Sequence, residues 1–213
     1  MKKYIIATIK EWNIDQYKRS KFKKNKNWYL ITDPKKLTIK YLDLIKPSYI
    51  FFPHWSKKVS SKIINKYKCI CFHETDVPYG RGGSPIQNLI IRNHEKTMIS
   101  ALRMTEVLDA GPIYLKKRLS LTGNAQQIYT RISKKVFKMI DLIVNNNSMP
   151  VAQKGKIVKF KRRNPKQSKI PKKNISLKKL YNHIRMLDAD TYPYAFLKYG
   201  NLKIEFKKAK IHN

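Results

Sequence analysis

The residues with the clearest chemical potential lie in one polar, glycine-rich segment, CFHETDVPYGRGGSPIQNLIIRN, at positions 71–93. Its histidine, two acids and threonine, at 73–76, directly follow the apolar run KCICF. The glycines that come next allow backbone N–H groups to approach a ligand closely, and Arg81 offers a forked donor for a phosphate or a carboxylate. A surface turn with a charged tip is the alternative interpretation of the same residues.

A second candidate is Asp109, in the stretch LDAGPIY. Asp-Ala-Gly-Pro is ordinary turn chemistry, and on composition and spacing alone a simple turn is the favoured interpretation. The functional interpretation is that a pair of strands returns this turn to the side of His73, where a carboxylate orients the imidazole and stabilises its protonated form. The residues alone leave both interpretations open.

The elements that must position these residues alternate along the first half of the chain. Short β-rich apolar runs predict buried strands at 3–9, 28–32, 49–53 and 68–72. Apolar residues at helical spacing predict helices between them, at 38–45 and 60–67. This alternation predicts an α/β fold with a parallel sheet that is covered by helices on both faces. Ligands of such sheets collect beyond the carboxyl ends of the strands, which is where His73 falls.

The rest of the chain is predicted to add helices, a strand pair and a hairpin. Apolar periodicity and the capping residue Asn124 predict the longest helix, at 124–146. Further elements are predicted as helices at 85–93 and 176–188, strands at 97–104 and 112–121, and a hairpin at 196–206. The basic, proline-containing stretch 152–173 is typical of a connector. We therefore expect a domain over residues 1–150 and a small extension over residues 151–213.

The formal net charge of +34, from 47 Lys and Arg against 13 Asp and Glu, requires an explanation. So basic a surface attracts phosphates, and binding to a nucleic acid is one interpretation. A lysine-rich solvated surface around a site for a small anionic ligand is the other. Lysines occur in nearly every segment and form no single stripe with interleaved aromatics, which favours the second interpretation. We therefore expect no nucleic-acid partner.

The two cysteines, Cys69 and Cys71, lie on one face of a predicted strand. No second Cys or His pair stands at zinc spacing, so we expect reduced thiols and no metal site. No apolar run approaches the roughly 18 residues that a membrane span needs, and Lys10 interrupts the first apolar run too early for a secretory signal. We expect a cytoplasmic protein without a membrane partner, and no pattern indicates its oligomeric state.

Two stretches, CFHETDVPYGRGGSPIQNLI and ISALRMTEVLDAGPIYLK, resemble in this order the core of the folate-dependent formyltransferases. The resemblance covers residues 49–145. It implies a Rossmann-like formyltransferase domain with a mostly parallel sheet, followed here by a short C-terminal α+β extension, and 10-formyltetrahydrofolate as the cofactor. Members of this family carry Asn-x-His at the end of a strand and a later Asp in a turn. His73 and Asp109 match these positions, and Cys71 stands in the place of the Asn.

The resemblance implies that a substrate amine attacks the formyl carbon directly and that negative charge develops on the formyl oxygen. In this scheme His73 stabilises that charge or takes the proton of the amine, and Asp109 keeps the imidazole oriented and basic. The pterin ring of the cofactor is expected to lie against main chain that follows one strand and precedes the Asp turn. The residues expected there are Phe51, Phe52, Pro53, Met104, Val107, Leu108 and Gly111.

Cys71 is the main departure from the family pattern. The family's Asn amide donates a hydrogen bond to the developing oxyanion, whereas a thiol is a weak donor. Loss of one such donor typically costs about 100- to 1,000-fold in rate, so an active enzyme should supply a substitute. His54, in FFPHWS, is the candidate substitute, with packing on Trp55 as an equally weighted alternative. Cys71 as a covalent nucleophile is disfavoured, since the amine attack in this family is direct.

The segment FHETDVPYGRGGSP and the tail HIRMLDADTYPYAFLKYGNLKIEF resemble sugar-nucleotide N-formyltransferases, in particular those acting on UDP-linked 4-amino sugars of pseudaminic-acid-type pathways. This implies a UDP- or dTDP-linked amino-dideoxy sugar, destined for surface polysaccharide, as the substrate. The alternatives are a methionyl-tRNA formyltransferase-like enzyme, which the short tail disfavours, and a catalytically decayed RNA-binding protein on the same scaffold. Packing within the small extension is the simpler interpretation of each aromatic in the tail. The residues expected to contact the substrate are Thr75, Arg81, Gly82, Gly83, Gln87, Asn88, Arg185, Tyr192 and Phe196.

Overall fold

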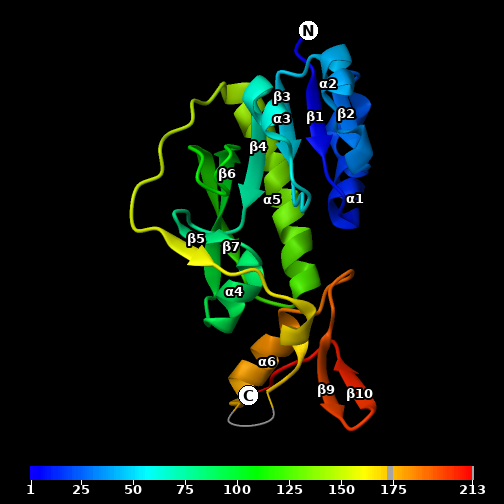
Figure 1. Ribbon diagram of the computed structural model, residues 1–213, viewed down its shortest axis with the longest axis vertical. Coiled ribbons are helices and arrows are strands. Elements are labelled where there is room, and N and C mark those ends of the chain that lie inside the picture. The colour runs from blue at the N-terminus through cyan, green and yellow to red at the C-terminus, as the bar shows by residue number, and fades with distance from the viewer. Residues whose placement is uncertain (172–174, 213) are drawn as a thin grey trace.

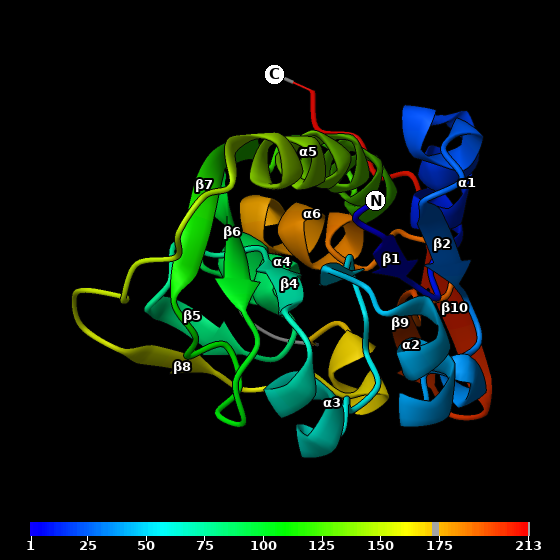
Figure 2. The same ribbon diagram turned by 90° about the horizontal axis from the view of Figure 1, so that it is seen from above.

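One six-stranded β-sheet with helices on both faces forms the centre of the molecule (Figures 1 and 2). The computed structural model describes residues 1–171 and 175–212. The strand order is β2-β1-β3-β4-β6-β7. These strands are β1 (Tyr4–Ala7), β2 (Trp28–Ile31), β3 (Tyr49–Phe52), β4 (Cys69–His73), β6 (Lys96–Arg103) and β7 (Ile113–Ser120). β1 to β4 are parallel and β6 is antiparallel to β4 and β7, which confirms the predicted mostly parallel α/β sheet.

Helices α1 (Glu11–Arg19) and α5 (Ala125–Asn146) cover one face of the sheet. The helix predicted at 124–146 is confirmed as α5, and Asn124 begins it with a reciprocal capping box to Gln127. The sequence analysis did not predict α1. Trp12 on α1 stacks on Tyr129 of α5, with ring centroids 5.1 Å apart, so contact with α5 holds this polar helix against the sheet.

Helices α2 (Ile39–Ile45) and α3 (Ser61–Lys66) cover the other face, as their apolar spacing predicted. Thr38 and Ser60 cap them, each accepting a hydrogen bond from a backbone N–H of the first turn. The neighbouring residues Ile5 and Ile6 of β1 are both completely buried, one on each face of the strand. Burial on both faces explains why these strands are apolar throughout.

The glycine-rich segment contains a strand that the sequence analysis did not predict. After β4 the chain forms β5 (Tyr79–Gly82) and then α4 (Pro85–Ile91). β5 pairs in parallel with β8 (Val158–Phe160), which the chain reaches after running from α5 back along the side of the molecule (Figure 1). Residues after position 150 therefore pack directly against β5, which belongs to the first 150 residues.

The C-terminal part consists of α6 (Leu177–Arg185) and a hairpin of β9 (Ala195–Tyr199) and β10 (Leu202–Phe206). The hairpin turns at Gly200, whose φ of 55° suits glycine, and this confirms the predicted turn. The described residues also form the short 3₁₀ helices η1 (Lys21–Lys24), η2 (Pro34–Lys36) and η3 (Pro165–Ser168). The predicted connector 152–173 contains β8 and η3, and its residues 172 and 173 lie outside the described residues. The domain boundary at residue 150 stays a prediction.

Within residues 1–171 and 175–212, no helix combines the length and the apolar character that crossing a membrane requires. The same ranges contain no group of three or more His, Cys, Asp or Glu side chains arranged to hold a metal ion.

Candidate active site

A cleft of about 980 Å³ opens beyond the carboxyl ends of β3 and β4. Segments that are distant in the sequence line it, among them the ends of these two strands, the turn between β6 and β7, the start of α4, residues 162–168 around η3, and residues before β9. The cleft lies where a parallel sheet places its ligands. It contains all three residues predicted to be catalytic, His73, Asp109 and His54.

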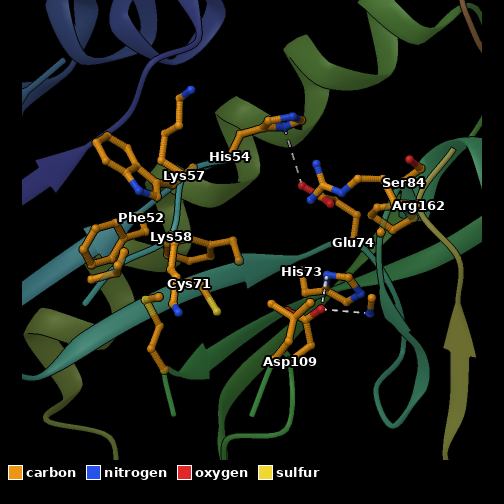
Figure 3. A pocket seen from close by; sticks show the side chains of 18 of the residues that line it. Phe52, His54, Lys57, Lys58, Cys71, His73, Glu74, Ser84, Asp109 and Arg162 are labelled. Carbon is orange, nitrogen blue, oxygen red and sulfur yellow. Dashed lines mark hydrogen bonds and ion pairs between the residues drawn. The ribbon is translucent and has the colours of Figure 1, made fainter. Parts of the chain in front are cut away.

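His73 ends β4 and is only 6% exposed. Its Nε2 donates a hydrogen bond to the carbonyl oxygen of Gly80 at 2.7 Å, because a carbonyl can only accept. Its Nδ1 lies 3.5 Å from Oδ2 of Asp109. The predicted meeting of imidazole and carboxylate is therefore present, and a protonated ring at this place would form an ion pair with Asp109 (Figure 3).

Asp109 is held by the shape of its own turn and by the glycine-rich strand. Its φ of 54° is left-handed, which Asp tolerates better than most residues. Its Oδ2 accepts a hydrogen bond from the backbone N–H of Gly82 at 2.9 Å. A Cβ on Gly111 would lie 1.7 Å from the carbonyl oxygen of Arg103, so the close of this turn has room only for glycine.

The glycine-rich strand β5 holds both members of the pair through its backbone. The carbonyl of Gly80 accepts from His73, and the N–H of Gly82 donates to Asp109. Gly82 has a φ of 108°, and a Cβ there would lie 2.4 Å from the carbonyl oxygen of Phe160 on β8. The glycines thus allow the backbone to come close to β8 and to the pair at the same time.

Gln153, from the segment between α5 and β8, fixes the turn of Asp109 from behind. Its Nε2 donates to the carbonyl oxygens of Asp109 at 2.9 Å and Gly111 at 2.8 Å. Its Oε1 accepts two hydrogen bonds from the guanidinium of Arg81, at 3.1 and 2.7 Å. Arg81 therefore acts on the active site indirectly, because it holds the side chain of Gln153 against the turn of Asp109.

Glu74 and His54 form a second group, across the cleft from the first. Oε1 of Glu74 lies 3.9 Å from Nδ1 of His54, and Nε2 of His54 is 3.1 Å from the hydroxyl of Tyr192. In Figure 3, Glu74 points toward His54, whereas His73 points toward Asp109. Among the described residues, Nδ1 of His54 is buried without a hydrogen-bond partner.

The charges of this second group follow from its burial. Burial lowers the pKa of His54 to about 3, and the positive charge of Lys10 adds to the effect, so the ring is neutral. The 3.9 Å approach to Glu74 is therefore not an ion pair. Burial also raises the pKa of Glu74 to about 7; the nearby His73 opposes this rise and Asp109 adds to it. Glu74 consequently exchanges a proton close to neutral pH.

Cys71 lines the cleft and lies two residues before His73 on β4. Burial raises the pKa of its thiol, and the negative charges of Asp109 and Glu74 raise it further. A thiol held in its neutral form is a poor nucleophile, which agrees with the disfavoured status of covalent catalysis by Cys71.

The residues predicted to bind the cofactor divide into two sets. Phe52, Met104, Leu108 and Gly111 line the cleft. Phe51 is completely buried in the core, and Pro53 directs its carbonyl oxygen to Thr8 and Asn13. Val107 is 67% exposed and lies outside the cleft lining.

The residues predicted to bind the substrate divide in the same way. Gly82, Gly83, Gln87 and Tyr192 line the cleft, whereas Thr75, Arg81, Asn88, Arg185 and Phe196 do not. Asn88 and Arg185 use their donors on the chain itself. Nδ2 of Asn88 donates to three carbonyl oxygens, and the guanidinium of Arg185 donates to the carbonyls of Leu121 and Gly123 and to Asn182. Phe196 belongs to the hairpin.

Several cleft residues were not singled out by the sequence analysis. Basic side chains from three segments line the cleft, namely Lys57, Lys58, Arg103, Arg162 and Arg163. Tyr129 of α5 also reaches it, and Glu74 was noted only for its place after a strand. No local pattern marks the basic group, because its members are brought together only by the β5–β8 pairing and the sheet.

Comparisons with known proteins add to this geometry. A family model described as "Methionyl-tRNA formyltransferase, C-terminal domain" matches residues 165–213. A solved structure described as "Methionyl-tRNA formyltransferase from Clostridium thermocellum" is 43% identical, with a TM-score of 0.96, over 100% of this chain and 94% of that one. A curated methionyl-tRNA formyltransferase of Mesoplasma florum is 29% identical over 88% of this chain. The match spans 63% of the length of that relative.

A more distant structure shows the fold alone. HypX from Aquifex aeolicus, described as a complex with tetrahydrofolic acid, is 15% identical with a TM-score of 0.77 over 97% of this chain and 37% of that one.

These similarities contradict the expectation of a sugar-nucleotide N-formyltransferase branch. The same similarities contradict three related predictions. These are the UDP- or dTDP-amino-sugar substrate, the link to polysaccharide biosynthesis and the absence of a nucleic-acid partner. The error had two physical sources. The short tail was judged by length, although residues 165–213 match the C-terminal domain of the tRNA branch. The scatter of lysines along the sequence was taken as scatter in space, although basic residues from three segments gather at one cleft.

Proposed function

The chain belongs to the methionyl-tRNA formyltransferase family, and on this premise we propose that it transfers a formyl group from 10-formyltetrahydrofolate to the amino group of methionyl-tRNA. The predicted cofactor is confirmed, since formyltransferases of this family use 10-formyltetrahydrofolate. The observation that carries the proposal is the His73–Asp109 pair, set in a large cleft of a chain whose similarity to a methionyl-tRNA formyltransferase extends over its full length.

The residues of the cleft fit a folate. Phe52, Ile64, Met104 and Leu108 give the lining an apolar part that suits a flat ring. Trp55 also lines the cleft, and its Nε1 is buried without a hydrogen-bond partner among the described residues. An unused buried donor of this kind can bind the polar edge of a ring system. Bound in this cleft, the cofactor supplies an activated formyl group.

The His73–Asp109 pair supplies the electrostatics of the transfer. Negative charge develops on the formyl oxygen when the amine attacks the formyl carbon, and the imidazole of His73 beside the reacting group stabilises that charge. Asp109 keeps the ring oriented, since its Oδ2 lies 3.5 Å from Nδ1. The backbone of β5 holds both side chains in place before the substrate arrives.

The basic character of the chain supports a tRNA as the carrier of the amine. Its formal charge is +34, and Arg162 and Arg163 extend the positive character into the cleft itself beside Lys57 and Lys58. A surface of this kind attracts the phosphates of an RNA and releases its counterions. The amine is then delivered from the same side as the basic residues.

Release of tetrahydrofolate on mixing the protein with 10-formyltetrahydrofolate and methionyl-tRNA tests the proposal. We expect release with methionyl-tRNA and none with uncharged tRNA or with free methionine. The apparent affinity for methionyl-tRNA should fall steeply as salt rises, because phosphate contacts release counterions. Equal release with uncharged tRNA, or no release with any of the three, would contradict the proposed substrate.

A further inference from the structure

Formyl transfer requires a group that removes a proton from the attacking amine, and the two nitrogens of His73 are already engaged. Nε2 donates to the carbonyl of Gly80 at 2.7 Å, and Nδ1 faces Asp109 at 3.5 Å. Asp109 in turn uses the same Oδ2 for the N–H of Gly82. This pair can stabilise negative charge, but the incoming amine finds no free basic atom on the imidazole.

Glu74 offers such an atom. Its side chain is 8% exposed, it lines the cleft, and it follows His73 directly on the chain. The carboxylate interacts with its own backbone N–H. No side chain in the described ranges donates a hydrogen bond to it, and His54, at 3.9 Å, lies beyond hydrogen-bond distance. A buried carboxylate with unused acceptor capacity is suited to an amine that enters the cleft.

His54 complements this arrangement. Its Nε2 contacts the hydroxyl of Tyr192 at 3.1 Å, and when the ring donates from Nε2 to that hydroxyl its Nδ1 is unprotonated. Nδ1 can then accept an N–H of the amine, which leaves the lone pair of the amine free to attack. Two polar atoms 3.9 Å apart can both contact one small group that lies to the side of the line joining them. An amino group that lies beside this pair in the cleft can therefore direct one N–H to each of the two atoms.

We propose that Glu74 is the group that accepts the proton of the attacking amine, and that His54 positions the amine beside it. The inference rests on the proposed function and adds the residue that makes the amine nucleophilic. It also gives His54 a role other than the replacement of an oxyanion donor.

The step balances as follows. The amine nitrogen forms a bond to the formyl carbon, and its proton passes to a carboxylate oxygen of Glu74. The bond between the formyl carbon and N10 of the cofactor then breaks, and N10 receives the proton that Glu74 took. One proton moves from the amine to N10, and Glu74 ends the turnover as it began.

The electrostatic surroundings support this role. Burial raises the pKa of Glu74 to about 7, so the carboxylate is a stronger base than an exposed one and still ionises near neutral pH. The titratable groups near it are His54, Cys71, His73, Asp109, Tyr129 and Tyr192, and the charged guanidinium of Arg162 lines the same cleft. His54 and Cys71 are neutral at this pH, because burial lowers the pKa of the first and raises that of the second.

The test compares the pH profiles of kcat/KM for the wild-type protein, Glu74→Gln and Glu74→Asp, with methionyl-tRNA and 10-formyltetrahydrofolate. Glu95→Gln is the matched control, since Glu95 is exposed and lies outside the cleft lining. We expect Glu74→Gln to lower kcat about 100- to 10,000-fold, the usual contribution of a general base. The acid side of its pH profile should report one ionising group fewer than that of the wild type. The ionisation of the substrate amine should remain visible. Glu74→Asp should keep the full acid limb at a lower rate.

Binding of tetrahydrofolate, measured by calorimetry, separates a folded variant from a damaged one and should be unchanged in Glu74→Gln. A Glu74→Gln rate within threefold of the wild type would overturn the inference. A low rate with an unaltered acid limb would also overturn it, because a purely structural role predicts that result. Absence of turnover by the wild-type protein would overturn the proposed function, and only that result removes the premise of this inference.

Discussion

The two sides of the cleft differ in how completely their polar groups are paired. On one side, His73 and Asp109 contact each other and the backbone of β5, with distances of 2.7 Å to Gly80 and 2.9 Å to Gly82. On the other side, Glu74 and His54 stand 3.9 Å apart, and Nδ1 of His54 has no partner among the described residues. Both sides are buried, so the difference is one of pairing.

This difference separates two ways of preparing a reaction. The paired side is fixed before substrate binds, which suits the stabilisation of a charge that develops in the transition state. The incompletely paired side retains unsatisfied polar atoms, which cost stability in the free protein and become satisfied when an amine enters. The fold tolerates that cost because the hydrophobic cores on both faces of the sheet stabilise it without any contribution from Glu74 or His54.

The largest effect is expected from breaking the paired side. Asp109→Asn removes the carboxylate that faces Nδ1 of His73, and His73→Asn removes the ring itself; each should lower kcat about 1,000-fold. Steady-state kinetics would measure this, with Asp190→Asn as the matched exposed control. A rate within tenfold of the wild type for either variant would retire the role of that residue.

The incompletely paired side should reveal itself as a pH-dependent loss of stability. The pKa of Glu74 is 4.5 when unfolded and about 7 when folded, so between these values the folded state holds a proton that the unfolded state has released. Stability therefore falls as pH rises through this window, by about 3 kcal/mol from this group. Urea unfolding at pH 5 and pH 8 would measure the loss, and Glu74→Gln should lack it. An equal loss in both proteins would show that Glu74 is not the buried carboxyl responsible.

A smaller effect is expected from the support behind the paired side. Gln153→Ala removes the donor to the carbonyls of Asp109 and Gly111 and leaves Arg81 without its acceptor. A slight displacement of Asp109 should lower kcat about tenfold with little change in the binding of tetrahydrofolate. Gln16→Ala, on α1, is the control. If Gln153→Ala instead weakens folate binding at unchanged kcat, the turn serves binding and not the orientation of Asp109.

The smallest effect is expected at Cys71, whose thiol lines the same cleft. Cys71→Ala should change kcat by about threefold or less, because a neutral thiol is a weak donor. Alkylation by iodoacetamide at pH 8 should also be slow, since burial and the charges of Asp109 and Glu74 raise the pKa of this thiol. Rapid alkylation accompanied by loss of activity would indicate a reactive thiolate and reopen covalent catalysis.

The sequence predicted those parts of the fold that local patterns determine. The capped helix α5 and the apolar strands β1 to β4 carry their own signals, as apolar spacing and as a capping residue. Helix α1 carries little apolar periodicity and is held by the stacking of Trp12 on Tyr129. The β5–β8 pairing joins segments more than seventy positions apart, and glycines in β5 suggested a loop.

Those parts of the site that stand in local sequence motifs were predictable, and those that depend on contacts between distant segments were not. His73 and Asp109 stand in short motifs, and the structure brings them together. The roles of Gln153, Glu74 and the basic cleft residues depend on contacts between distant segments, which no single pattern encodes. Asn88 and Arg185, which were predicted to contact the substrate, donate hydrogen bonds to backbone carbonyls in this structure, and their role in substrate binding stays a prediction.

The most direct test of the whole account is mass spectrometry of the amino acid released from methionyl-tRNA after incubation with the protein and 10-formyltetrahydrofolate. The account predicts N-formylmethionine from the wild-type reaction and only methionine from the His73→Asn reaction. Unmodified methionine in both, with the cofactor bound to the protein, would contradict it.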